Sequence, residues 1–163
     1  STWGQEVLRF PARDMDYIGV GDIRFPPEGW IKPTHTFYWS YTYAWSINVN
    51  RKITTKELEV DLEKYFNSLN KVDVSDKTDK RIATATITKK KRKKSVTFYE
   101  GKVATYDRFA TNKRFVLNVK IESNYCKKTK KTVLLFTFSP KDFKHEVWET
   151  LDTIKLKNGI CKN

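Results

Sequence analysis

Residues 35–50 alternate between large apolar and small polar side chains, and no other segment restricts the fold as strongly. Successive side chains of a β-strand point to opposite faces of a sheet, so the alternation predicts one long strand, or two shorter ones, with an aromatic face. That face consists of Phe37, Trp39, Tyr41, Tyr43, Trp45, Ile47 and Val49. The chain is therefore expected to be built around a sheet.

The segments that follow predict two helices and a run of strands. Thr54 and Glu57 form a capping-box pattern at the start of a helix near residues 55–70. Ser139 and Pro140 are typical of the start of a second helix near 140–154. Between the helices, short connections predict antiparallel strands at 81–88, 95–99, 103–109, 114–123 and 132–138. These elements predict an α+β fold with a mostly antiparallel sheet of about six to seven strands.

Length and composition favour one folded unit. The chain has 163 residues and 39% hydrophobic content, so we expect a single globular domain over 1–163, with 1–33 as a loop-rich N-terminal segment. No run of about 18 apolar residues exists that could span a membrane. The start at Ser1 instead of methionine favours removal of a leader. We expect a monomer.

The two cysteines, Cys126 and Cys161, suit a single disulfide in an exported protein. The bond would close a loop of about 36 residues and contribute roughly 4 kcal/mol by the chain-entropy relation. The alternative is two unrelated reduced thiols. With the disulfide, the protein is expected to be secreted or periplasmic, with a lipid anchor as an alternative form of attachment.

Charge is segregated along the chain. Residues 1–79 hold ten Lys/Arg and twelve Asp/Glu, whereas residues 80–163 hold 22 Lys/Arg and seven Asp/Glu. Such a surplus attracts anionic partners but does not specify an activity. The candidate anion-binding residues are Lys89, Lys90, Lys91, Arg92, Lys93, Lys94, Lys113 and Arg114. The simpler interpretation is that the cations are solvated hairpin tips that discourage aggregation at sheet edges.

Gly101 decides where these cations gather. If Glu100 and Gly101 form a tight turn, the loop 89–94 lies at the same sheet end as 112–114, and 127–131 lies at the opposite end. If Gly101 is a bulge within one strand, 89–94 and 127–131 share an end. We predict the turn, and therefore two separate basic loops.

Three segments carry a resemblance to a known family: Ile23 to Trp30 (IRFPPEGW), Tyr99 to Ala104 (YEGKVA) and Leu151 to Leu156 (LDTIKL). They resemble the opening strand, the middle Gly-Lys hairpin and the last helix of the PsbP/Mog1-like α/β/α sandwich. The resemblance implies a fold and supports the turn at Gly101. It carries no activity over, because family members have diverse roles and these segments are turns and caps. Many members are exported bacterial proteins.

Few residues point to catalysis. The two histidines lie in different elements, and no metal-binding spacing occurs, so we predict no metal and no cofactor. No nucleophile motif is present. Asp14 with Asp16, or Asp61 with Glu63, are carboxylate pairs that a hydrolase would need, but both are more simply exposed acids.

The aromatic strand has two interpretations. Trp39, Tyr41, Tyr43 and Trp45 line a ligand groove, or the strand is central and its aromatic face lies under a helix. We favour the second. Together these patterns predict a non-catalytic exported binding or accessory module of unknown ligand. The alternatives are a protein that binds polyanions (anionic glycan, lipid headgroups or nucleic acid) through its lysine-rich loops, and a hydrolase with carboxylates near the aromatic strand.

Overall fold

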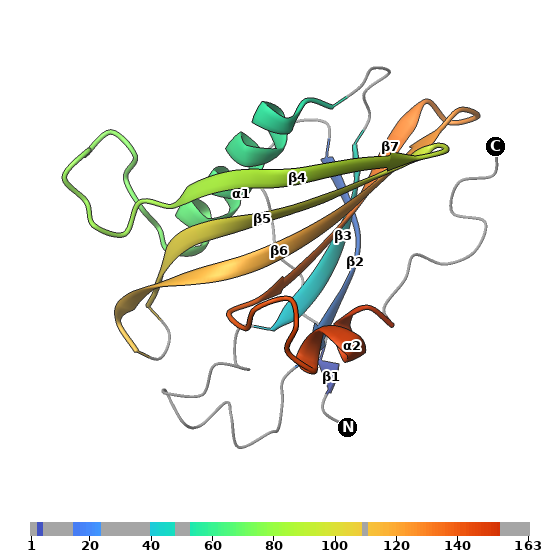
Figure 1. Ribbon diagram of the computed structural model, residues 1–163. Helices are drawn as coiled ribbons and strands as arrows, with labels where there is room; N and C mark the ends of the chain where they lie inside the picture. The colour runs from blue at the N-terminus through green and yellow to red at the C-terminus, as the bar shows by residue number, and fades with distance from the viewer. Residues whose placement is uncertain (1–2, 5–14, 24–39, 48–52, 109–110, 154–163) are drawn as a thin grey trace.

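The computed structural model describes residues 3–4, 15–23, 40–47, 53–108 and 111–153, and within the first three ranges it describes only Ser40 and Thr42 beyond the backbone. Seven strands in these residues form one antiparallel sheet in the order β1-β2-β3-β7-β6-β5-β4 (Figure 1). The strands are β1 (Trp3–Gly4), β2 (Met15–Ile23), β3 (Tyr41–Ile47), β4 (Thr84–Lys93), β5 (Val96–Asp107), β6 (Lys113–Cys126) and β7 (Lys131–Ser139). The helices are α1 (Thr55–Leu69) and α2 (Val147–Leu151).

The α+β class, the antiparallel sheet and the two helices are confirmed. The resemblance to the PsbP/Mog1-like sandwich stays a prediction. Both ends of the predicted long strand, residues 35–39 and 48–50, fall in the ranges 24–39 and 48–52. These ranges lie outside the described residues.

Helix α1 begins at the predicted capping box. The amide of Glu57 donates to Thr54 Oγ1 at 3.1 Å, and the amide of Thr54 donates to Glu57 Oε1 at 3.3 Å. These bonds satisfy amides that the first helical turn leaves free. Leu58, Leu62 and Phe66 follow at helical spacing and are fully buried. The helix therefore docks through one apolar stripe.

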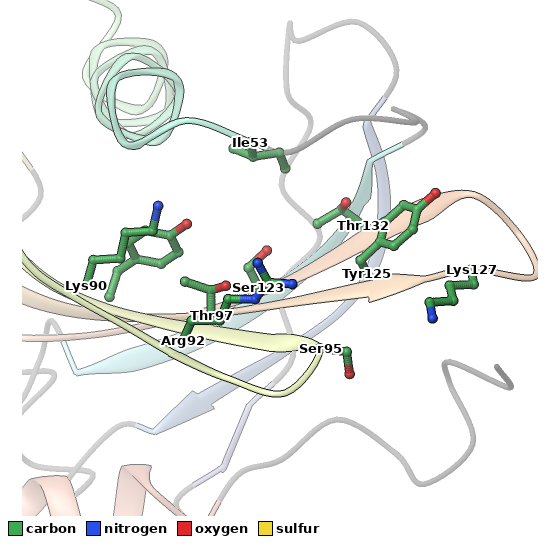
Figure 2. A pocket seen from close by; sticks show the side chains of 10 residues that line it. Ile53, Lys90, Arg92, Ser95, Thr97, Ser123, Tyr125, Lys127 and Thr132 are labelled. Carbon is green, nitrogen blue, oxygen red and sulfur yellow. The ribbon is translucent and has the colours of Figure 1, made fainter.

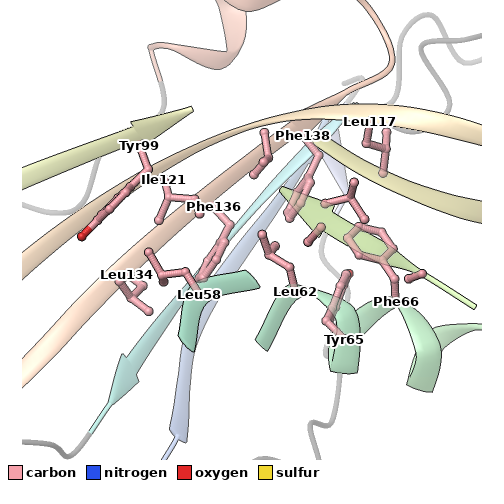
Figure 3. Packing of buried hydrophobic residues seen from close by; sticks show 14 residues of the cluster. Leu58, Leu62, Tyr65, Phe66, Tyr99, Leu117, Ile121, Leu134, Phe136 and Phe138 are labelled. Atoms are coloured by element: carbon pink, nitrogen blue, oxygen red, sulfur yellow. The ribbon is translucent and has the colours of Figure 1, made fainter. Parts of the chain in front are cut away.

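The main core lies between α1 and the faces of β5, β6 and β7 (Figure 3). The strands contribute inward-facing residues at every second position, including Val103, Leu117, Val119, Ile121, Leu134, Phe136 and Phe138. Phe66 meets Phe138 edge to face, with ring centroids 5.4 Å apart. Each of these three strands therefore presents one face to the core.

Helix α2 lies on the other side of the sheet from α1 (Figure 1). Its Trp148 is buried beside Phe143, and the indole N–H donates to Lys141 O at 2.9 Å. The predicted helix start near residue 140 is wrong. Ser139 is the last residue of β7, and its hydroxyl accepts from the amide of Lys141 in a tight turn. That turn, rather than a helix, brings Phe143 against Trp148.

The two strands predicted at 95–99 and 103–109 form the single strand β5, so the predicted turn at Gly101 is wrong. Gly101 instead lies opposite a β-bulge in β4, where the pairing shifts between Ile87 and Lys89. A Cβ at residue 101 would lie 2.4 Å from the carbonyl oxygen of Thr86, a distance that backbone cannot accommodate. The glycine is needed because two backbones approach closely, not because the chain reverses.

The position of the basic loops follows from this register. Lys93 pairs with Val96, Val96 pairs with Asn124, and Cys126 pairs with Lys131. The β4–β5 and β6–β7 hairpins therefore project from the same end of the sheet (Figure 1). The prediction of two basic loops at opposite ends is wrong, and the alternative in which 89–94 and 127–131 share an end is correct.

Helix α1 also protects part of the sheet edge at β4. Three amides on this edge donate to acceptors spaced four residues apart on α1, which lie on one helix face. The pairs are Ala83 N with Asn67 Oδ1 (2.8 Å), Ala85 N with Glu63 Oε2 (2.9 Å) and Ile87 N with Glu59 Oε2 (2.8 Å). They replace the hydrogen bonds that another strand would make, so this half of the edge cannot pair with a second chain.

Candidate anion-binding site

We call residues 89–94 and 127–131 the basic end. They contain ten Lys and Arg residues and no acid. Lys89 has an ion-pair partner, Glu100, at 3.7 Å. In the part of the chain that the structure describes, none of the five cations from Lys90 to Lys94 forms a salt bridge. Because like charges repel, so many cations in two adjacent hairpins favour an anionic ligand between or along them.

The bulge at Thr88 determines which cations of the lysine run lie on each face of β4. Before the bulge, Ala85 and Ile87 pair with Val103 and Gly101 on the face that α1 covers. After the bulge, Lys90 pairs with Tyr99 and Arg92 with Thr97, which continue the same face of β5. Lys89, Lys91 and Lys93 therefore point to the opposite face.

A pocket of about 390 Å³ lies on the α1 side of the basic end (Figure 2). It forms there because the sheet outreaches the helix: β6 has 14 residues, or roughly 45 Å at strand rise, whereas the 15 residues of α1 span only about 22 Å. Its lining consists of cations, hydroxyl-bearing residues and one aliphatic side chain: Ile53, Lys90, Arg92, Ser95, Thr97, Tyr99, Ser123, Tyr125, Lys127 and Thr132.

The described lining of this pocket contains three cations and no carboxylate. Lys90 Nζ lies 6.0 Å from the ring centroid of Tyr99, at the limit of a cation–π contact. Burial raises the pKa of Tyr99, so its hydroxyl stays protonated at neutral pH. The chemistry of the pocket is therefore that of donors and positive charge, which suits an oxyanion.

Two of the sequence-predicted anion-binding residues lie elsewhere. Lys113 and Arg114 begin β6, at the opposite end of the sheet from Cys126. Arg114 Nη1 donates to the carbonyl oxygens of Lys80 and Ile82. It therefore anchors the segment before β4, and it does not contribute to the basic end as predicted.

The other predicted binding residues lie partly or wholly outside the described residues. Tyr41, Tyr43 and Trp45 are in β3, but their side chains are outside the described part, and Trp39 is outside it altogether. The aromatic groove stays a prediction. Cys126 is buried at the end of β6, whereas Cys161 lies beyond the described residues, so the disulfide stays a prediction as well.

The two described carboxylates of the hydrolase alternative, on Asp61 and Glu63, do not line the pocket. Glu63 accepts from the amide of Ala85 and so serves the sheet edge. Asp61 lies on the same helix, but it is not part of the pocket lining. Asp14 and the side chain of Asp16 lie outside the described part. Among the described residues, no group of three His, Cys, Asp or Glu side chains is placed to hold a metal ion.

Sequence reasoning missed the hydroxyl residues of the pocket. Thr97, Ser123 and Thr132 occupy inward-facing positions, in register with the core residues of the same strands. A recognisable signal exists: in β6 the inward series Leu117, Val119, Ile121 gives way to Ser123. A polar residue at the end of an apolar alternation marks where the covering layer stops.

No protein-family model and no curated protein sequence matches this chain. None of the helices in the described residues has the length and apolar character needed to cross a bilayer.

Proposed function

We propose that this protein is a non-catalytic module that binds anionic polymers through its basic end. The observation that carries the proposal is the strand register, which brings the two lysine-rich hairpin tips to the same end of the sheet. A polymer with repeated sulfate or phosphate groups can contact both tips at once. An extracytoplasmic location accords with the predicted disulfide and belongs to the same proposal.

The arrangement supports a polymer rather than a small isolated ion. The cations lie on both faces of β4 and at both turns, so they cover a broad surface. Contacts of this kind release counterions from the polymer, and affinity then falls steeply with salt. Charge alone gives little sequence or pattern recognition.

The test compares two variants with the same loss of charge. In the tip variant, Lys93, Lys94, Lys128 and Lys130 are changed to serine, two from each hairpin. In the control variant, Lys64, Lys77, Lys80 and Lys113 are changed to serine; these residues lie on α1, in the connection after it and at the far end of β6. Circular dichroism checks that both variants fold.

Binding to heparin and to a single-stranded DNA oligonucleotide is measured by fluorescence anisotropy over a range of salt concentrations. We expect the tip variant to bind about 100-fold more weakly at ~50 mM salt, and its log–log salt slope to be smaller by about 3, since each lost phosphate contact removes roughly 0.7–0.9. The control variant should change affinity less than about threefold. Equal losses in both variants would show that only net charge matters and would overturn the proposal.

A further inference from the structure

The core of the protein ends in a polar row that crosses three strands. Arg92 pairs with Thr97, Thr97 pairs with Ser123, and Ser123 pairs with Leu134. One row closer to the middle of the sheet, the β5, β6 and β7 positions are the buried Tyr99, Ile121 and Phe136. The pocket floor is therefore polar at the point where the sheet leaves the helix, while its inner wall is the end of the core.

Several hydroxyl groups in this pocket lack a partner. Thr97, Ser123 and Thr132 line it, and their hydroxyls make no hydrogen bond to any residue that the structure describes. Among the described residues the one side-chain atom buried without a partner is Asn70 Oδ1, so these hydroxyls keep some exposure to the pocket. Water can bond to such groups in the free protein, and a ligand can take its place. A ligand with acceptor oxygens would satisfy these donors.

Arg92 supplies the recognition element. Its Nε donates to Lys94 O at 3.3 Å, whereas its two terminal nitrogens have no partner among the described residues. Figure 2 shows Arg92 beside Thr97 and Ser123 on the sheet, between Lys90 on one side and Tyr125 with Thr132 on the other. A guanidinium presents a planar pair of donors that matches two oxygens of a sulfate or phosphate, which an ammonium cannot do.

The size of the pocket exceeds what a single oxyanion needs. Its volume of about 390 Å³ falls in the range of sites for small organic ligands. Ile53, above the sheet, and Tyr125, on β6, provide apolar surface where the body of a ligand can pack. We propose that the pocket binds one sulfate or phosphate ester carried on a sugar ring, with Arg92 and the hydroxyls of Thr97, Ser123 and Thr132 holding the oxyanion. This proposal deepens the proposed function, because the ester would be one substituent of the bound polymer.

The experiment uses the full chain and three small probes: glucose 6-sulfate, glucose 6-phosphate and unmodified glucose. Isothermal titration calorimetry measures the dissociation constant of each. We expect one-to-one binding of at least one ester and no binding of glucose. Preference for the sulfate would point to a sulfated glycan, and preference for the phosphate to a phosphorylated polymer.

Three variants assign the recognition to the pocket. Arg92→Lys keeps the charge but loses the paired donors, so ester affinity should fall at least about tenfold. Thr132→Val removes one hydroxyl from the pocket at nearly constant shape and should cost roughly five- to tenfold. Lys113→Gln removes an exposed charge at the opposite end of the sheet and is the control, with an expected change below about twofold. Equal affinity of Arg92→Lys and the unaltered protein would overturn the proposal.

Failure of this inference is distinguishable from failure of the proposed function. If neither ester binds while heparin binding still depends on the hairpin tips, the pocket inference is wrong and the polymer-binding function stands. If an ester binds in the pocket while the tip variant retains full heparin affinity, the pocket inference stands and the polymer-binding function is wrong.

Discussion

The two halves of strand β4 differ in what covers their outer edge. From Thr84 to Ile87 the edge lies beside α1, whose Glu59 and Glu63 accept two of its amides. From Lys89 to Lys93, beyond the bulge, no side chain of the described part of α1 bonds to the edge, and the residues are cationic. The first half is protected by hydrogen bonding and the second by charge repulsion, which are two solutions to the same problem of an exposed strand. Only the second leaves groups available for a ligand.

The largest expected contrast concerns packing. Leu62→Ala removes a fully buried side chain where α1 meets the covered half of the sheet, and it should lower the free energy of unfolding by about 3 kcal/mol. Thr97→Ala, at the basic end, should change it by less than about 0.5 kcal/mol. Urea denaturation followed by circular dichroism measures both. Similar losses at the two positions would mean that the basic end is as tightly packed as the rest, and the comparison would fail.

The next contrast concerns the edge itself. Glu63→Ala leaves the amide of Ala85 without its acceptor, and this should cost about 1–2 kcal/mol. Glu63→Gln keeps an acceptor oxygen and should stay within about 0.5 kcal/mol of the unaltered protein. Amide hydrogen exchange reports on the site directly, because the Ala85 amide should exchange faster in Glu63→Ala than in Glu63→Gln. Unchanged exchange at Ala85 would show that α1 does not protect this edge.

The helix cap and the bulge show why one part of the fold could be predicted from the sequence and another could not. Helix α1 was predictable, because its capping box and apolar spacing are local patterns. The bulge at Thr88 was not, since it depends on the close approach of Gly101 from another strand. A glycine between two polar residues has the same local appearance in a turn and under a bulge. Because of this ambiguity we predicted the two basic loops at opposite ends of the sheet, whereas they lie at the same end.

The site was readable only in part, for a related reason. The cations of the basic end are evident from composition, but which of them face the pocket depends on the bulge. Without it, Lys90 and Arg92 would point away from the pocket. The hydroxyl residues are ordinary in a strand, and their role emerges only when the register places Thr97 and Ser123 in one row with Arg92.

A smaller effect should appear in the pH dependence of stability. Burial raises the pKa of Asp61 from 3.8 to about 6, with Lys64 opposing and Glu57 adding to the shift. The folded protein then holds this proton more tightly than the unfolded chain, so the free energy of unfolding falls as pH rises from about 4 to about 6. Because Asp61 is partly exposed, we expect only about 1 kcal/mol, rather than the roughly 3 kcal/mol that 1.36 kcal/mol per pKa unit would give.

Asp61→Asn tests how much stability is lost by ionising a partly buried carboxyl group on α1. The variant should be more stable than the unaltered protein at pH 7 by about 1 kcal/mol, and the difference should vanish near pH 3.5, where both side chains are neutral. Urea denaturation at the two pH values gives the comparison. A stability difference that is the same at both pH values would mean that the effect is one of shape and not of ionisation.

The smallest expected effect lies at the tip of the β4–β5 hairpin. Lys94 has a φ of 59°, in the left-handed region that glycine adopts most easily, and Lys130 in the β6–β7 turn has a φ of 54°. A residue with a side chain is disfavoured there by about 1–2 kcal/mol relative to glycine. Glycine recovers only part of this, because it loses more conformational entropy on folding. Lys94→Gly should therefore stabilise the protein by about 0.5 kcal/mol, whereas Lys93→Gly, within the strand, should destabilise it by a similar amount.

The same two variants separate stability from binding. Both remove one tip cation, so both should weaken heparin binding by a similar factor of a few, while their effects on unfolding have opposite signs. If Lys94→Gly instead lost stability as Lys93→Gly does, the turn would not be strained. If it gained stability and kept full heparin affinity, the lysine would have no role in binding. The expected pattern, a more stable protein that binds less well, would explain why both hairpins place lysine where glycine fits better.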